Sequence, residues 1–177
     1  MQLRELVELA VLTFRSDVAD LALRLVGRHV RHETAAAVPG FPELILDICT
    51  GTGSILIEYA RRFPTSRVIT VDRDPRALAL VARRLRESGS VNLETVTGEA
   101  DDLPFTDGTV DIVNISFGLH ENDRRSRERI LKECFRVLNP GGRLVVTDYR
   151  EARGSVGPAL MRLYLALFEP RWVPEIF

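Results

Sequence analysis

The sequence has few of the residues that mark secreted, membrane-spanning or nucleic-acid-binding proteins. Among its 177 residues there are two cysteines and a single lysine, Lys132. Two cysteines without a recognisable signal peptide exclude a disulfide framework and favour a cytoplasmic protein. No apolar run approaches the ~20 residues that a membrane span requires. A net charge of -1 provides no basic field, so we expect no nucleic-acid partner.

The composition that remains is that of an ordinary globular protein, with 45% hydrophobic and 28% charged residues. A chain of this length is expected to form one domain with a sizeable core. We divide it into an N-terminal helical region (1–40), a ligand-binding core (41–149) and a C-terminal helical segment (150–177).

The stretch LILDICTGTG, Leu44 to Gly53, organises the chain. Its apolar run predicts a strand buried on both faces of a parallel sheet. Gly51 and Gly53 allow a tight turn that a ligand can approach closely. Residues Ser54 to Arg62 then have the apolar spacing of a helix. In an open α/β sheet, ligands bind where strands end and helices begin.

Strands and helices are expected to alternate along the rest of the chain, which predicts parallel pairing through right-handed crossovers. The fold class is therefore α/β, a Rossmann-like, doubly wound parallel sheet of about five strands with N-terminal helices and a C-terminal helix. Further strands are predicted at 67–71, 91–97, 110–116 and 143–147, the last after a tight turn at 140–142. Helices are predicted within 1–33 and at 76–87, 124–137 and 157–168.

An acidic residue, Asp72, ends the second strand 19 positions after Gly53. This spacing places a carboxylate beside the glycine turn, where it can accept both hydroxyls of a ribose. The alternative is that Asp72 only caps the next helix. Asp74, followed by Pro75 at the first helical position, is the better capping candidate.

The glycine turn lacks the features that bind phosphates. Leu56 occupies the third position of a G-x-G-x-x-G pattern, and there is no G-x-x-x-x-G-K-[ST] loop. A nucleoside without phosphates, such as S-adenosylmethionine, suits the turn better. Asp47 would then hold its ammonium group. A nicotinamide cofactor is the less favoured alternative.

The stretch GEADDLPF follows the third strand. The carboxylates of Glu99 and Asp101 can accept from an adenine amine, and the backbone at Ala100 can donate to a ring nitrogen. The alternative interpretation is a solvated acidic loop.

Five segments in this order resemble the class I S-adenosylmethionine-dependent methyltransferases: LDICTGTG, VDRDP, GEADDLPFTDGTVDIV, SFGLH and RVLNPGGRLVV. The resemblance covers about residues 43–149 and is strongest to the ubiquinone/menaquinone-biosynthesis C-methyltransferases. It implies a methyl acceptor that is a small or lipid-like molecule of quinol, phenol or amine type. The implied cofactor residues are Asp47, Gly51, Thr52 and Gly53 for the methionyl end, Asp72 for the ribose, Arg73, Glu99, Ala100 and Asp101 for the adenine, and Ser116 below the methyl group. The family usually has Asp where Glu99 stands.

His120 follows the fourth strand, where an acceptor is expected, and its titration range suits a general base. Glu121 is a candidate to orient the ring of His120, and packing at the strand end is the alternative role of His120. The quinone enzymes typically have Arg at the position of His120, which disfavours a quinol acceptor. Asp148 and Tyr149 are further acceptor-side candidates. We predict no metal site and assign both cysteines to core packing.

A full domain of this family has seven strands, and we expect the last two to be absent here, with a truncated gene product as the rival explanation. We therefore expect an exposed edge on the strand at 143–147 and a homodimer formed through that edge or through the C-terminal segment. The rival to an enzyme is a nucleoside-binding module without catalysis. RNA methylation is less favoured, because Arg124, Arg125, Arg127 and Arg129 would spread over more than one helix face.

Overall fold

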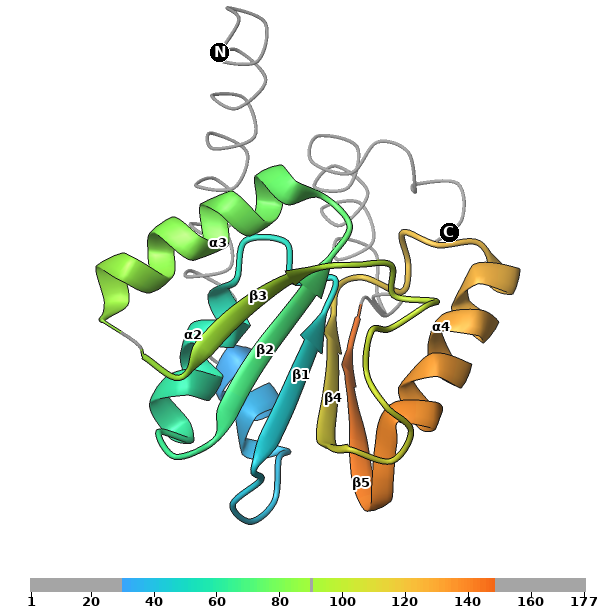
Figure 1. Cartoon of the computed structure of the whole chain (residues 1–177), viewed down its shortest axis with the longest axis horizontal. Coiled ribbons are helices and arrows are strands. Elements are labelled where there is room, and N and C mark those ends of the chain that lie inside the picture. Colours follow the sequence, from blue (N-terminus) through green and yellow to red (C-terminus); the bar gives the residue numbers. More distant parts are fainter. Residues whose placement is uncertain (1–29, 90, 149–177) are drawn as a thin grey trace, which may run out of the picture.

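The computed structural model describes residues 30–89 and 91–148. Five parallel strands form one sheet in the order β3-β2-β1-β4-β5, which confirms the predicted doubly wound α/β sheet (Figure 1). The named elements are β1 (Leu44–Ile48), α2 (Ser54–Arg62), β2 (Arg67–Asp72), α3 (Pro75–Ser88), β3 (Leu93–Thr97), β4 (Val110–Ser116), α4 (Arg124–Val137) and β5 (Leu138–Thr147). Residues 30–36 are also helical.

The central strand β1 pairs with β2 on one side and β4 on the other, and four of its five residues are buried. Helices α2 and α3 cover one face of the sheet and α4 covers the other (Figure 1). The core on the α2–α3 face contains Ala35, Ile45, Leu56, Tyr59, Val68, Val81 and Ile112. The core on the α4 face contains Leu46, Ile48, Ile69, Val113, Ile115, Ile130 and Cys134.

Local sequence signals explain where the helices begin and end. The side chain of Asp74 accepts from the backbone N–H of Arg76 at 2.9 Å and caps α3, as predicted. Pro75 occupies the first helical position, and Gly89 ends the helix with a φ of 68°. Asp123 caps α4 by accepting from the N–H of Ser126 at 2.8 Å. These caps fix the points at which the chain leaves the sheet.

Two strand boundaries differ from the sequence prediction. Strand β3 begins at Leu93, two residues later than predicted, and Val91 before it is 97% exposed. Strand β5 begins at Leu138, where the sequence predicted a helix end and a turn. Leu138 pairs with Val110 and Arg143 pairs with Ile112, so residues 139–142 form an irregularity inside the strand. The Pro-Gly-Gly sequence therefore interrupts β5 after it has begun.

Several predictions concern residues outside the described part of the chain. The predicted helix at 157–168 lies there, as do residues 1–29 of the predicted helical region 1–33 and Tyr149. Strand β5 forms one edge of the described sheet, and Val146 is 45% exposed on it. The predicted homodimer through this edge stays a prediction. No helix within 30–89 and 91–148 is long and apolar enough to cross a membrane.

The loops after β1 and β4 touch at the carboxyl end of the sheet. Cys49 and Phe117, one residue beyond each strand, have φ angles of 58° and 56°, a region that non-glycine residues rarely adopt. Gly118 packs directly on Cys49, since a Cβ atom added to Gly118 would lie 2.5 Å from the Cβ of Cys49. The two loops therefore hold each other in place.

We expect Gly118→Ala to destabilise the protein, because the added methyl has no room beside Cys49. Overpacking of this kind costs about 1–3 kcal/mol. Cys49→Gly removes the opposing side chain, so the double variant should recover most of the loss in thermal unfolding. Equal melting temperatures for Gly118→Ala and the double variant would contradict the proposed loop contact.

Candidate functional site

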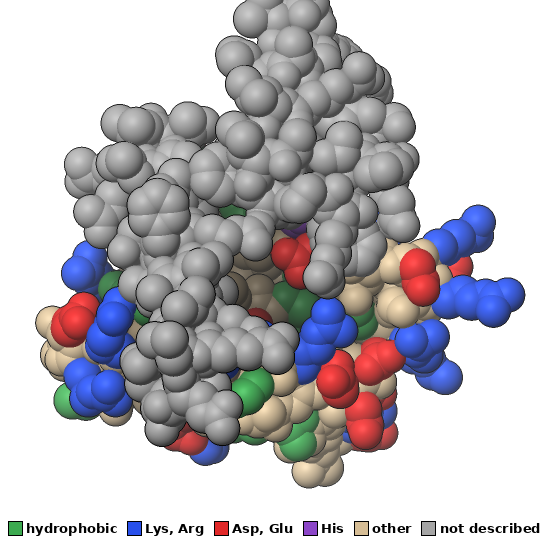
Figure 2. Space-filling model, turned by 90° about the horizontal axis from the view of Figure 1, so that it is seen from above, with side chains coloured by type: hydrophobic (Ala, Val, Ile, Leu, Met, Phe, Trp, Pro, Cys, Tyr) green, Lys and Arg blue, Asp and Glu red, His purple; other side chains and the backbone are tan. Residues whose placement is uncertain are grey.

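A cavity of about 360 Å³ opens at the carboxyl ends of the strands. Nine of the ten predicted cofactor residues line it: Asp47, Gly51, Thr52, Asp72, Arg73, Glu99, Ala100, Asp101 and Ser116. The tenth, Gly53, lies behind the turn, where an added Cβ would meet Val81 at 2.9 Å. Viewed from above, charged side chains of both signs gather on the side of α4 (Figure 2).

The floor of the cavity contains a buried carboxylate, Asp47, which is 2% exposed. The Nδ2 atom of Asn114 donates to its Oδ1 at 2.6 Å, and the Tyr59 hydroxyl donates to the Oδ1 of Asn114 at 2.9 Å. Burial raises the pKa of Asp47 to about 6, and the hydrogen bond from Asn114 opposes that rise. Among the described residues Asp47 forms no ion pair. A cation in the cavity would therefore stabilise it.

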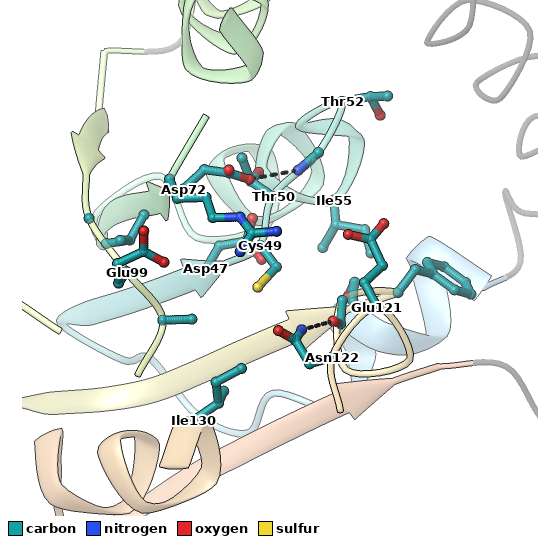
Figure 3. Close-up of a pocket in the computed structure, with 18 of the residues that line it drawn as sticks. Asp47, Cys49, Thr50, Thr52, Ile55, Asp72, Glu99, Glu121, Asn122 and Ile130 are labelled. Carbon is teal, nitrogen blue, oxygen red and sulfur yellow. Dashed lines mark hydrogen bonds between the residues drawn. The ribbon is translucent and has the colours of Figure 1, made fainter. Parts of the chain in front are cut away.

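Asp72 lies at the end of β2 and faces the glycine turn (Figure 3). Its Oδ2 atom accepts a long hydrogen bond from the N–H of Gly51 at 3.5 Å, and its Oδ1 accepts from the N–H of Asp74 at 3.0 Å. Since Asp74 itself caps α3, Asp72 is not the helix cap. Its carboxylate lines the cavity beside the turn.

The acidic stretch after β3 forms an ordered wall. Asp101 pairs with Arg129 of α4 at 2.9 Å. Glu133 accepts from the N–H of Leu103 at 2.9 Å, and Arg136 donates to the carbonyl oxygens of Leu103 and Phe105 at 2.9 and 2.8 Å. Charged groups of α4 thus fix the loop that carries Glu99 and Ala100.

The arginines of α4 make separate contacts. Arg124 pairs with Glu128, whereas Arg127 donates to the carbonyl oxygen of Leu119. Together with the contact from Arg129 to Asp101, these bonds use the guanidinium groups within the protein. The lower preference for RNA methylation stays a prediction.

The backbone at the start of α2 and the hydroxyl of Thr50 give the cavity its hydrogen-bond donors. Helix α2 begins at the cavity with Gly53 as N-cap, and no described side chain caps it or places an acid in its first turn. The Thr50 hydroxyl lies near enough to Asp47 to lower its pKa, yet its buried Oγ1 makes no hydrogen bond of ordinary geometry to any described residue. Space is open beside Gly51, where an added Cβ would meet nothing within 4 Å.

These hydrogen-bond donors, together with the carboxylates of the cavity, fit S-adenosylmethionine. The N–H groups at the start of α2 match a carboxylate, and Asp47 matches an ammonium group. Asp72 and Glu99 lie on one side of the cavity and match a ribose diol and an adenine amine (Figure 3). Glu121 and Asn122 lie on the other side, which leaves that side for an acceptor (Figure 3). Sequence reasoning missed Thr50 and Asn114, although a polar Asn in the apolar β4 strand is a visible signal.

His120 does not line the cavity. Its ring is 7% exposed, and its Nδ1 atom lies 2.7 Å from Oδ1 of Asp148. The backbone N–H groups of Leu119 and His120 donate to Oδ2 of Asp148 at 3.1 Å each. The predicted part of Glu121 in orienting the ring is untested, and Asp148, directly after β5, holds the ring of His120. Its role as a base stays a prediction.

The cysteines differ from each other. Cys134 is fully buried in the core, as predicted, whereas Cys49 lines the cavity (Figure 3). Burial raises the pKa of the Cys49 thiol to about 12, so it is not a ready nucleophile. No group of three or more His, Cys, Asp or Glu side chains among the described residues is arranged to hold a metal ion.

We expect Asp47→Asn to stabilise the ligand-free protein at pH 7. The folded state binds the Asp47 proton with a pKa of about 6 instead of 3.8, so stability falls as pH rises between these values. Asparagine removes this cost, which is up to about 3 kcal/mol. Denaturant unfolding at pH 5 and pH 7 measures the effect. A loss of stability at pH 7 would show that the ionised carboxylate is favourable.

Comparisons with known proteins agree with this geometry. Residues 45–142 match the family model described as a methyltransferase domain. The chain is 38% identical over 119 residues to a demethylmenaquinone methyltransferase of Thermus thermophilus, covering 67% of this chain and 53% of that protein. It is also 38% identical over 109 residues to the ubiquinone/menaquinone biosynthesis C-methyltransferase UbiE of an Enterobacter species, covering 60% and 43%.

A crystal structure from Methanococcus maripaludis has the same fold, with a TM-score of 0.72 at 12% identity, over 93% of this chain and 73% of that one. The chain spans about half the length of the curated relatives that it matches. The family model covers more than half of this chain, including β1, the glycine turn and Asp72. The chain therefore belongs to the class I S-adenosylmethionine-dependent methyltransferase domain family.

Proposed function

We propose that this chain transfers a methyl group from S-adenosylmethionine to a small-molecule or lipid-like acceptor of quinol, phenol or amine type. The observation that carries the proposal is the convergence of a buried carboxylate, Asp47, with the uncapped start of α2 in one cavity. Together they form a site of opposite charges suited to an amino acid group. The names of these relatives, a demethylmenaquinone methyltransferase and a ubiquinone/menaquinone biosynthesis C-methyltransferase, support an acceptor of this size.

Each cavity residue has a defined part in this proposal. Asp47 would hold the ammonium group, the backbone at Gly51 and Thr52 the methionyl end, and Asp72 the ribose. Glu99 and Ala100 would bind the adenine edge, with Arg73 against its face. Ser116, which accepts from Asn114 at 3.1 Å, would form the floor beneath the methyl group.

When bound, S-adenosylmethionine supplies a methyl group that is already strongly electrophilic. The protein's task is then to align an acceptor with that group and to exclude water. The loops after β1 and β4, which touch at Cys49 and Gly118, give the cavity a rigid floor for this alignment.

An acceptor that is a poor nucleophile must also lose a proton. We assign this role to His120, held by Asp148 at 2.7 Å beside the cavity-lining Gly118 and Glu121. The carboxylate would stabilise the protonated imidazole. An amine acceptor that is already deprotonated needs no such base, so dependence on His120 distinguishes acceptor classes.

Two other functions are less well supported. A nicotinamide oxidoreductase would have a glycine where Leu56 stands, but Leu56 is fully buried in the core beneath the turn. A binding module without catalysis would keep the cofactor cavity. Turnover alone separates that module from an enzyme.

We expect Asp72→Ala to weaken S-adenosylhomocysteine binding about 10- to 100-fold, because hydrogen bonds to a charged group contribute about 1.5–3 kcal/mol. Asp102→Ala is the matched control, since Asp102 is exposed and does not line the cavity. Isothermal titration calorimetry measures both. Equal affinities for the two variants would contradict the proposed role of Asp72 in binding S-adenosylhomocysteine.

The proposed activity is tested with methyl-labelled S-adenosylmethionine and a panel of reduced quinones, phenols and amines. We expect label transfer to one acceptor class, with His120→Gln lowering turnover by at least about 100-fold for a quinol or phenol and leaving S-adenosylhomocysteine affinity unchanged. Tight S-adenosylhomocysteine binding with no label transfer across the panel would favour the binding module.

A further inference from the structure

A row of buried polar side chains crosses the sheet beneath the cavity. Tyr59 of α2 and Asn114 of β4 are both 0% exposed, and Asp47 of β1 is 2% exposed. The Tyr59 hydroxyl donates to Oδ1 of Asn114 at 2.9 Å, and Nδ2 of Asn114 donates to Oδ1 of Asp47 at 2.6 Å. Polar groups in a core are expensive unless they are hydrogen bonded, so this row invites a functional explanation.

The hydrogen bonds give the Asn114 amide a direction. An ionised carboxylate only accepts hydrogen bonds, so the NH₂ end of the amide must face Asp47. The opposite, oxygen end is satisfied by Tyr59, and the second donor of the NH₂ group reaches Oγ of Ser116 at 3.1 Å. An amide fixed in this way stabilises the charged form of Asp47 and keeps the Oδ1 atom of Asp47 turned toward β4.

We propose that Asn114, braced by Tyr59, is a positioning residue that keeps Asp47 ionised and oriented in the cavity, and so sets the lower pH limit of cofactor binding. This inference rests on the proposed function, in which Asp47 holds the cofactor's ammonium group. Asn114 itself does not line the cavity, so it acts through Asp47.

The charged and titratable groups around Asp47 leave room for this control. Asp72 at the end of β2 opposes ionisation of Asp47 by charge repulsion and adds to the effect of burial on its pKa. Burial raises the pKa of the Cys49 thiol and of the Tyr59 hydroxyl, so both stay neutral between pH 5 and pH 9. Arg73 and Glu121 also line the cavity. The hydrogen bond from Asn114 is the largest effect that lowers the pKa of Asp47.

The test compares S-adenosylhomocysteine binding from pH 5 to pH 9 in the wild type, Asn114→Leu and Tyr59→Phe. Wild-type affinity should fall about tenfold per pH unit below the Asp47 pKa of about 6. In Asn114→Leu the onset of this loss should move up by about one pH unit or more. Tyr59→Phe keeps every carbon atom of the ring, and it should move the onset of the affinity loss in the same direction by a smaller amount.

Asn92→Leu is the matched control. Asn92 also holds the fold together, since its Nδ2 donates to the carbonyl oxygens of Phe63 and Ser66 at 3.1 and 2.9 Å, but it does not line the cavity. A loss of stability alone would therefore appear in Asn92→Leu without a shift in the pH profile. A shift of equal size in this control would overturn the positioning role.

A carboxyl-carbon NMR titration of Asp47 in the ligand-free variants tests the same role without the cofactor. A raised titration midpoint in Asn114→Leu and Tyr59→Phe supports it. An unchanged midpoint in folded Tyr59→Phe and Asn114→Leu overturns it, even if S-adenosylhomocysteine binds. Failure of the wild type to bind S-adenosylhomocysteine at any pH would instead refute the proposed function and, with it, the pH limit.

Discussion

The site depends on one electrostatic constraint, a carboxylate buried at the centre of the sheet. Asp47 is the next-to-last residue of the apolar β1 strand and is 2% exposed, with a pKa that burial raises to about 6. Near neutral pH the protein bears the cost of ionising it, and among the described residues only hydrogen bonds offset that cost. A contribution to folding stability poorly explains why the Asp47 carboxylate is buried. Its burial is well explained by a cationic ligand that completes the charge pair.

The walls of the cavity follow from how the neighbouring elements are held. Asp72 bridges the glycine turn and the start of α3, and Gly118 packs on Cys49 to join the loops after β1 and β4. On the adenine side, Glu133 and Arg136 of α4 fix the loop after β3 through backbone hydrogen bonds. The cavity is therefore preformed on rigid elements, which is what alignment of two reactants requires.

The sequence predicts the site well where the chemistry of a residue and its position along the chain indicate the same role. The apolar run before Asp47, the glycine turn and the spacing to Asp72 predicted the central strand and most of the cavity lining. Asp74, which proline follows, is the cap of α3, as the sequence predicts in preference to Asp72.

Contacts between distant segments could not be predicted in the same way. The pairing of His120 with Asp148 spans 28 positions and depends on the register of β4 and β5. The start of β5 at Leu138 depends on pairing with Val110, which overrides the turn preference of Pro-Gly-Gly. The polar Asn114 stands out in the apolar β4 strand, but the sequence does not indicate its partners Tyr59 and Asp47, which lie 55 and 67 positions away.

The central claim is that a ligand's ammonium group completes the charge of Asp47, and proton release on binding tests it most directly. Calorimetric titration of S-adenosylhomocysteine at pH 6, in buffers of different ionisation enthalpy, counts the protons released. With an Asp47 pKa of about 6 in the free protein, we predict release of about half a proton by the wild type and none by Asp47→Asn. Tight binding without proton release, or equal release by both proteins, would contradict this account.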